Sequence, residues 1–162
     1  VAFDRAGMAI TLNGIAQGYI ADQVAAVLRR NGVRDVLLDL GEARTLGTGP
    51  DGRAWRIGIA DPADPVRVLG RIDCSDGAVA TSGGYGTVFD RDRQYGHLID
   101  PRDGRTAAVA RSVTVSAGEA TIADAWSTAF ALMTADEIRA VAAAVGGLGV
   151  HVSQAGSVVH LA

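Results

Sequence analysis

The sequence predicts an α+β protein, with a mixed or antiparallel sheet and helices packed on one side. Three observations lead to this class: the strand-like segments are many and short, the helical segments group at the start and near the end, and no regular βαβ alternation is present. The length of 162 residues suits one domain. We therefore treat residues 1–162 as a single domain with a core of small side chains.

The first third of the chain predicts a strand, a helix and a hairpin. Residues 8–12 are expected to form a short strand, and residues 15–30 an amphipathic helix that ends at Asn31-Gly32. Residues 33–40 form an apolar run typical of a buried strand, paired with residues 43–47. The apolar stripe of the helix is expected to consist of Ile15, Tyr19, Ile20, Val24, Val27 and Leu28.

The rest of the chain alternates between strands and turns before two helices and a final hairpin. Alternating side chains and Pro- or Gly-rich turns predict strands at residues 55–60, 66–72, 77–82, 95–99 and 111–116. Helical spacing predicts two helices, at residues 120–133 and 135–145. The chain closes with a hairpin of residues 149–153 and 157–161, and its His151 and His160 are expected on the surface.

Charge and cysteine content exclude several classes of protein. The net charge is −3 and the arginines form no basic run, which argues against a nucleic-acid partner. The lone Cys74 excludes an internal disulfide and a cysteine-based zinc site, and is expected to fill space in the core. No stretch approaches the ~18 apolar residues of a membrane span. Because the chain opens at Val1, we expect it to be a fragment of a longer protein.

His97 and Asp100 lie three residues apart, just before a turn that begins at Pro101. If the strand ends at Ile99, the turn can bring the Asp100 carboxylate back to the imidazole, where it would fix the tautomer and raise the basicity of His97. The alternative is a turn aspartate that accepts hydrogen bonds from its own backbone. The residues alone favour this second interpretation.

Asp124 and Thr128 are one helical turn apart, so their oxygens share a helix face. A carboxylate and a hydroxyl are a partial ligand shell for Mg2+, which keeps waters and substrate phosphates as its other ligands. The alternative is that Asp124 caps a local turn and Thr128 bonds back to a carbonyl.

Near Gly14 a Gly turn opens the first helix, an arrangement that can bind an anion.

Five segments in this order resemble blocks of the ApbE family of flavin transferases. Residues 11–19 resemble D-L-G-G-I-A-K-G-Y, and residues 39–42 resemble N-L-G-G-D. Residues 78–85 resemble A-V-A-T-S-G-x-Y, and residues 97–104 resemble H-I-I-D-P-x-T-G. Residues 112–115 with 123–128 resemble S-V-T-V and A-D-A-x-x-T. The first and second blocks also resemble, more loosely, the NosX-like branch. The resemblance implies an ApbE-like, T-fold-like domain without the N-terminal part that covers the flavin.

The resemblance implies an FAD:protein FMN transferase. His97 would remove the proton of an acceptor threonine, and the flavin-side phosphorus of FAD would then accept the threonine oxygen and release AMP. The Mg2+ ligands would be Gly14 through its carbonyl, with Asp124 and Thr128 through their side chains. FAD would contact Thr11, Gln17 and Leu98. Phosphoryl transfer needs an oriented nucleophile and neutralised phosphate charge, which a base and Mg2+ supply.

Two departures from the family pattern leave alternatives open. Thr11 stands where the family often has Asp, and Gln17 stands where it often has Lys, which removes a cation from the pyrophosphate. One alternative is an FAD pyrophosphatase with water as nucleophile; another is a flavin-binding or flavin-donating accessory protein with little turnover. The resemblance also implies a periplasmic or cell-envelope location. The partner would be an acceptor protein of the redox-complex subunit type, which could be membrane-associated.

Overall fold

The computed structural model describes residues 2–92 and 94–162. Its main sheet is antiparallel throughout, with the strand order β1-β2-β5-β6-β7-β8. These strands are β1 (Val36–Asp39), β2 (Ala43–Leu46), β5 (Ala78–Gly83), β6 (Arg111–Ala117), β7 (Gly149–Gln154) and β8 (Ser157–His160). A separate hairpin pairs β3 (Trp55–Asp61) with β4 (Asp64–Cys74).

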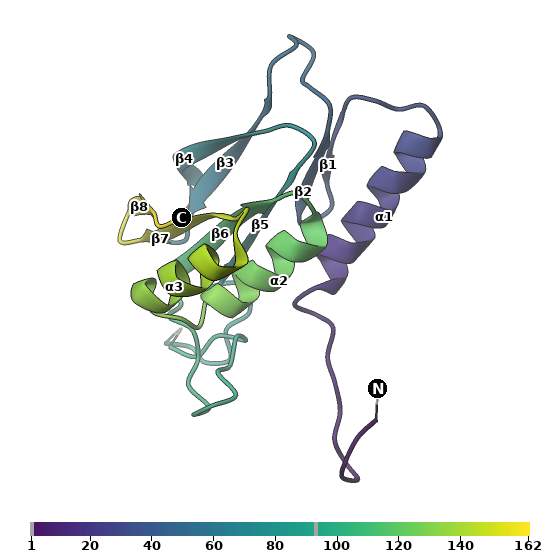
Figure 1. Cartoon of the computed structure of the whole chain (residues 1–162). Coiled ribbons are helices and arrows are strands. Elements are labelled where there is room, and N and C mark those ends of the chain that lie inside the picture. The colour runs from purple at the N-terminus through teal and green to yellow at the C-terminus, as the bar shows by residue number, and fades with distance from the viewer. Residues whose placement is uncertain (1, 93) are drawn as a thin grey trace.

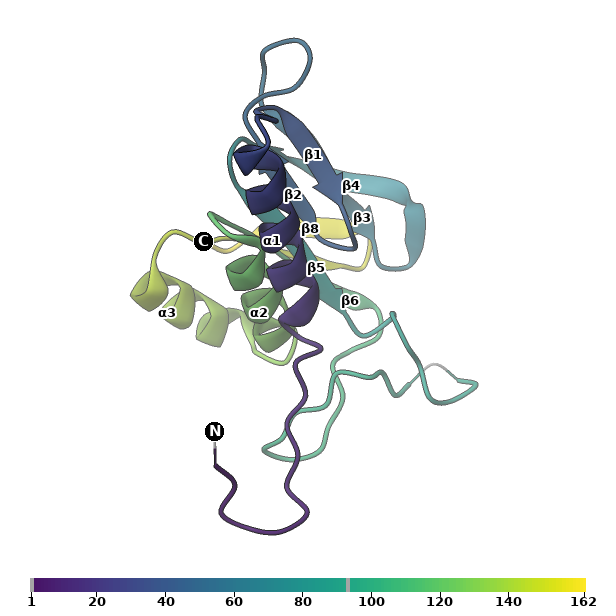
Figure 2. The same ribbon diagram turned by 90° about the vertical axis from the view of Figure 1, so that its right-hand side faces the viewer.

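Three helices lie on one side of this sheet, and the β3–β4 hairpin lies on the other (Figures 1 and 2). They are α1 (Ala16–Arg30), α2 (Ala120–Phe130) and α3 (Ala135–Val145). Helix α2 packs on β5 and β6 and against α1. The predicted α+β class, with an antiparallel sheet and helices on one side, is confirmed.

The core between α2, α3 and the sheet consists mainly of small and β-branched side chains, as predicted. Val113, Val115 and Val150 are fully buried on the strands, and Phe130 and Ile138 cover them from the helices. Thr134 begins α3 with a capping box, because its hydroxyl accepts from the Glu137 amide while the Glu137 carboxylate accepts from the Thr134 amide. Cys74 is buried, as expected for a space-filling side chain.

The predicted apolar stripe of α1 is wrong. The residues that α1 buries are Gly18, Ala21 and Ala25, whereas Tyr19 and Ile20 are about half exposed. The partner helix comes so close that only small side chains fit between the two backbones, since the Ala120 carbonyl occupies the space where a side chain of residue 18 would begin. Hydrophobicity alone therefore selected the wrong face of this helix.

Two predicted strands are absent from the part of the chain that the structure describes. Residues 8–12 are exposed and belong to no strand, and they extend away from the sheet toward the N-terminus (Figure 1). Residues 95–99 take part only in the isolated bridges Val88–Gly96 and Ile99–Thr106. The segment between β5 and β6 is therefore a long loop.

In the described residues, no helix combines the length and apolarity needed to cross a bilayer.

The terminal hairpin corrects a further expectation. His151 and His160 face each other across β7 and β8, with ring centroids 4.7 Å apart. The ring of His151 is half-buried rather than fully on the surface. Burial, followed by the nearby His160, lowers the pKa of His151. Adjacent imidazoles with a buried member favour the neutral form because two charges would repel.

Candidate active site

The site forms where the start of α1 meets α2. Gly18 lies in the first turn of α1, whose amides have no partner within the helix. Its N–H donates to the Oδ2 of Asp124, 2.9 Å away, so a buried carboxylate of α2 satisfies an amide of α1. Burial raises the pKa of Asp124, and the bond from Gly18 partly opposes this rise. The other oxygen, Oδ1, accepts no hydrogen bond within the described residues.

Gly14 and Thr128 lie in contact beside this carboxylate. A methyl group added at Gly14 would be 3.1 Å from the Cγ2 and 3.4 Å from the Oγ1 of Thr128. The Thr128 hydroxyl lies 3.1 Å from the Oγ of Ser82 on β5, which in turn lies 2.8 Å from the Oγ of Ser127. Thr128 thus bonds across to the sheet, not back to a carbonyl of its own helix. The three residues that the resemblance implies as Mg2+ ligands, Gly14, Asp124 and Thr128, thus lie together where the two helices meet.

A cavity of about 520 Å³ opens at this junction. Its wall combines residues from α1, α2, β5 and the long loop between β5 and β6. The seven residues to which the resemblance assigns a role in catalysis or binding all line it: Thr11, Gly14, Gln17, His97, Leu98, Asp124 and Thr128. The fold thus gathers groups that lie more than a hundred residues apart into one site.

His97 reaches the cavity from the long loop. The backbone of the loop holds the ring, because the amide of Thr87 lies 3.2 Å and its carbonyl oxygen 3.3 Å from the Nδ1 atom. Gly86 packs against the ring, and a methyl group there would be 3.0 Å from its Cε1. When the Nδ1–H donates to the Thr87 carbonyl oxygen, Nε2 is unprotonated and is the nitrogen that can accept a proton.

Asp100 does not orient the imidazole. Its carboxylate binds Arg102, with a distance of 2.6 Å to the Nη2 atom, and it also accepts from the Arg102 amide. Hydrogen bonds from the Arg102 side chain and backbone lower the pKa of Asp100 to about 2. Asp100 is the turn aspartate of the simpler interpretation, and its role as a partner of His97 is wrong. The competing arginine, only two residues away, explains the outcome.

Several side chains of the cavity wall had no role in the sequence prediction, among them Glu42, Ser82 and Tyr85. Glu42 is only 6% exposed and follows the turn between β1 and β2. Burial, and then the charges of Asp124 and Asp39, raise the pKa of Glu42 to about 8. A hydrogen bond from the Thr81 backbone partly opposes this rise. In the sequence Glu42 belongs to the segment 39–42 that resembles a family block, but a Gly-Glu turn is normally exposed and gave no reason to assign Glu42 a role.

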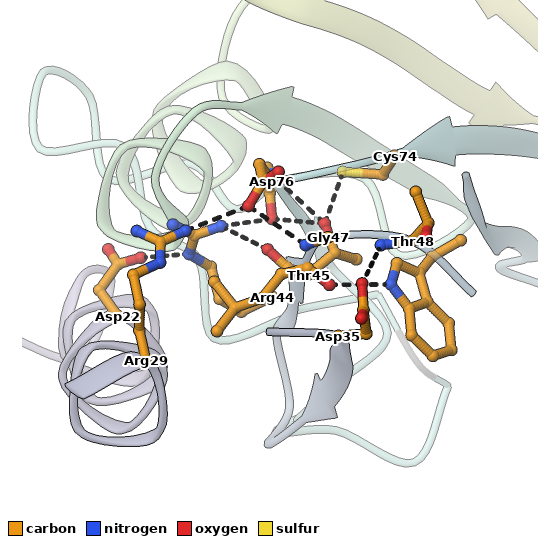
Figure 3. A network of polar contacts seen from close by, with 12 residues as sticks. Asp22, Arg29, Asp35, Arg44, Thr45, Gly47, Thr48, Cys74 and Asp76 are labelled. Atoms are coloured by element: carbon orange, nitrogen blue, oxygen red, sulfur yellow. Dashed lines mark hydrogen bonds and ion pairs between the residues drawn. The ribbon is translucent and has the colours of Figure 1, made fainter. Parts of the chain in front are cut away.

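A buried ion pair fixes the position of the two helices (Figure 3). Asp22 of α1 accepts from the Nε of Arg44 at 2.9 Å, and also from the amides of Ala120 and Thr121 at the start of α2. Arg44 further donates to the carbonyl oxygens of Thr45 and Gly77. Burial raises the pKa of Asp22, but the hydrogen bonds from Thr121, Ala120 and Arg44 outweigh it and lower the value overall. One carboxylate thus joins α1, α2 and β2.

The donors of the site fit Mg2+. Asp124 offers an unpaired carboxylate oxygen, Thr128 a hydroxyl, and Gly14 a neighbouring backbone carbonyl, all of them hard oxygen ligands. Across residues 2–92 and 94–162, no three His, Cys, Asp or Glu side chains cluster as they would in a zinc-type site. The described lining includes no arginine to neutralise a phosphate. A divalent cation would supply that missing positive charge.

Fold and site together define a class of protein: an α+β domain whose cavity brings hard oxygen ligands and a histidine together beside a space for an anionic ligand. The chain matches the model of the ApbE family over residues 1–151. It belongs to the ApbE family.

Curated relatives support this assignment. The FAD:protein FMN transferase of Klebsiella pneumoniae (strain 342) is 36% identical over 132 residues, which cover 79% of this chain and 40% of the relative. A protein of the same name from Vibrio cholerae is 37% identical over 139 residues, which cover 83% of this chain and 42% of the relative. The chain therefore spans about two-fifths of the length of these proteins.

Solved structures show the same fold. The ApbE protein of Thermotoga maritima superposes with a TM-score of 0.83 at 31% identity, covering 96% of this chain and 52% of the other. The flavin transferase ApbE of Vibrio cholerae superposes with a TM-score of 0.74 at 33% identity, covering 93% of this chain and 49% of the other. The predicted family is confirmed.

Proposed function

We propose that this chain carries the catalytic site of an FAD:protein FMN transferase. The observation that supports this function best is the single cavity that unites His97 with Gly14, Asp124 and Thr128. A base beside an oxygen-rich cation site is the arrangement that transfer of a phosphorus group requires. A protein that only bound or donated flavin would not need the base.

In this function, His97 accepts the proton of an acceptor threonine at Nε2 while its protonated Nδ1 donates to the carbonyl oxygen of Thr87. The threonine oxygen forms a bond to the flavin-side phosphorus, and the bond from that phosphorus to the bridging oxygen breaks. The bridging oxygen leaves with the electron pair as part of AMP. Mg2+ held by Gly14, Asp124 and Thr128 would neutralise charge on the pyrophosphate.

Thr11, Gln17 and Leu98 supply the remaining wall for FAD in this proposal. Gln17 extends toward the β1–β2 turn, where its Nε2 would lie 2.9 Å from a methyl group added at Gly41. An amide in this position can donate to a phosphate oxygen but adds no charge. We therefore expect the pyrophosphate to depend on the cation more than it would with a lysine at position 17.

FAD pyrophosphatase activity is a second candidate, and one observation favours it. The His97 side chain is exposed in this chain, so water can reach the base as readily as a threonine hydroxyl can. The same site would then release FMN and AMP.

For the transferase we further propose a threonine-bearing acceptor protein of the redox-complex subunit type, membrane-associated or not. We propose a periplasmic or cell-envelope location on the family resemblance.

The test compares wild type with His97→Asn and Asp124→Ala, using FAD, Mg2+ and an acceptor domain with or without its threonine. A general base contributes about 10²- to 10⁴-fold to the rate but little to ground-state binding. We expect His97→Asn to lose transfer by that order while its affinity for FAD changes only a few-fold. Asp124→Ala should lose Mg2+-dependent turnover and stay folded, because alanine suits a helix interior better than aspartate.

Covalent flavin on the acceptor, together with AMP, would support the transferase. FMN and AMP released equally with and without the threonine would identify the pyrophosphatase instead. Wild-type transfer by His97→Asn would contradict the base assignment, and loss of FAD binding by that variant would make His97 a ligand contact.

A further inference from the structure

Glu42 belongs to the cavity wall, but the proposed reaction gives it no role. Its side chain is more than nine-tenths buried, and within the described residues its Oε2 atom has no hydrogen-bond partner. The Thr81 backbone is the one group that hydrogen bonds to this carboxyl group in the described structure. An unsatisfied buried carboxylate oxygen is costly, so its retention calls for a partner that the folded chain does not itself supply.

The nearest arginine along the chain is not a partner for the Glu42 carboxyl group. Arg44 follows only two residues later, but its guanidinium is committed to Asp22 and to the carbonyl oxygens of Thr45 and Gly77. No arginine is among the described residues that line the cavity, and the chain contains no lysine. Among these described residues, Glu42 and Asp124 therefore share the cavity without an arginine or a lysine.

The position of Glu42 indicates how a cation could serve both groups. Gly14, Asp124 and Thr128 approach the cavity from the two packed helices, whereas Glu42 approaches it from the β1–β2 turn on the sheet. Mg2+ usually keeps several of its waters when it binds a protein. A carboxyl group that lines the same cavity as the direct ligands but comes from a different element can accept hydrogen bonds from such waters.

We propose that Glu42 is a positioning residue of the divalent-cation site, accepting hydrogen bonds from water on the ion that Asp124 binds directly. This inference rests on the proposed function, since it assumes a cation at Asp124. A doubly charged ion nearby favours the ionised form of Glu42, which then adds a second negative charge to the site and accepts at its buried oxygen. Partners of this kind, outside the direct ligands, typically affect metal affinity by 10- to 100-fold.

The experiment is a titration of the full chain with Mn2+ in the absence of FAD, followed by the paramagnetic signal of the free ion and by competition with Mg2+. Glu42→Gln keeps the shape and removes the charge. Asp39→Asn is the matched control, because Asp39 is exposed and lines a different cavity, one that adjoins Glu42. We expect Glu42→Gln to bind Mn2+ at least about tenfold more weakly and Asp39→Asn to stay within about twofold of wild type.

Asp124→Ala separates failure of this inference from failure of the proposed function. If Asp124→Ala loses the site while Glu42→Gln binds like wild type, the role of Glu42 is overturned and the cation site stands. If Asp124→Ala also binds like wild type, both are overturned. A Glu42→Gln variant with normal Mn2+ affinity but weakened FAD binding would make Glu42 a substrate contact. In EDTA we expect Glu42→Gln to melt at the same temperature as wild type or higher. Such a result excludes misfolding of the variant.

Discussion

At the scale of single residues, burial decides the protonation of Glu42. Its folded pKa is raised from 4.5 to about 8, first by burial and then by the charges of Asp124 and Asp39. The folded state therefore holds the proton at pH values where the unfolded chain has released it. The stabilising contribution is complete below pH 4.5 and is lost as the pH rises toward 8.

We expect the metal-free wild type to lose more stability between pH 5 and 8 than Glu42→Gln does. The difference should exceed about 1 kcal/mol, because one pKa unit corresponds to about 1.4 kcal/mol. Urea unfolding with EDTA at pH 5, 6.5 and 8 measures it. Burial lowers the pKa of His151, which changes stability with pH in the opposite sense, and this effect is common to both proteins. If the free energies of unfolding of wild type and Glu42→Gln changed equally with pH, the protonation of Glu42 would be contradicted.

The individual site residues differ in how far the sequence could reveal them. His97, Asp124 and Thr128 were found because motif and helical spacing are local properties of the chain. Glu42 was not, since its burial depends on β2 and β5 coming together beside α2. For Asp100 the sequence left two interpretations open and favoured the turn aspartate, which the fold confirms because the carboxylate binds Arg102 and not His97.

At the scale of elements, the close contact of α1 and α2 depends on Gly18. A methyl group at this position would lie 2.8 Å from the Cβ of Asp124 and would collide with the Ala120 carbonyl. Overpacking of this kind typically costs about 1–3 kcal/mol. Alanine recovers up to about 1 kcal/mol through its better helix propensity, so the clash should prevail.

We expect Gly18→Ala to lower the free energy of unfolding by about 1–2 kcal/mol and to weaken Mn2+ binding, because α1 must move away from Asp124. Gly118→Ala is the matched control, since a methyl group there meets no atom within 4 Å. Urea unfolding and Mn2+ titration of both variants measure the effects. A Gly18→Ala variant as stable as Gly118→Ala would show that the helices tolerate a wider separation.

The elements that the sequence predicted least well lie outside the regular sheet. Residues 8–12 alternate like a strand, but within the described structure no neighbouring edge pairs with them. Residues 95–99 have one bridge at each end, because the Gly-rich loop around them folds onto itself instead of joining β6. Strand pairing is a long-range property, whereas the helices and hairpins were predicted from local periodicity and turn residues.

At the scale of the whole molecule, Asp22 connects the parts that create the cavity. It binds Arg44 of β2 and the first amides of α2 while belonging to α1, and both members of the ion pair are largely buried. Removal of one partner of a buried pair leaves an uncompensated charge, which costs about 3–5 kcal/mol. This is a large part of the 5–15 kcal/mol that stabilises an ordinary domain.

We expect Asp22→Ala to lower the free energy of unfolding by about 3 kcal/mol and to lose Mn2+ binding, although residue 22 does not line the cavity. Asp136→Ala is the control, since it breaks an exposed pair with Arg139 and should cost less than about 1 kcal/mol. The difference in free energy of unfolding between Asp22→Ala and Asp136→Ala should become smaller at acidic pH. The folded pKa of Asp22 is lowered, so its stabilisation is present above the unfolded pKa and is lost as the pH falls through the folded one. Urea unfolding at pH 7 and pH 3 tests both points. Equal stability of the two variants at pH 7 would show that packing alone holds α1, α2 and β2 around the site.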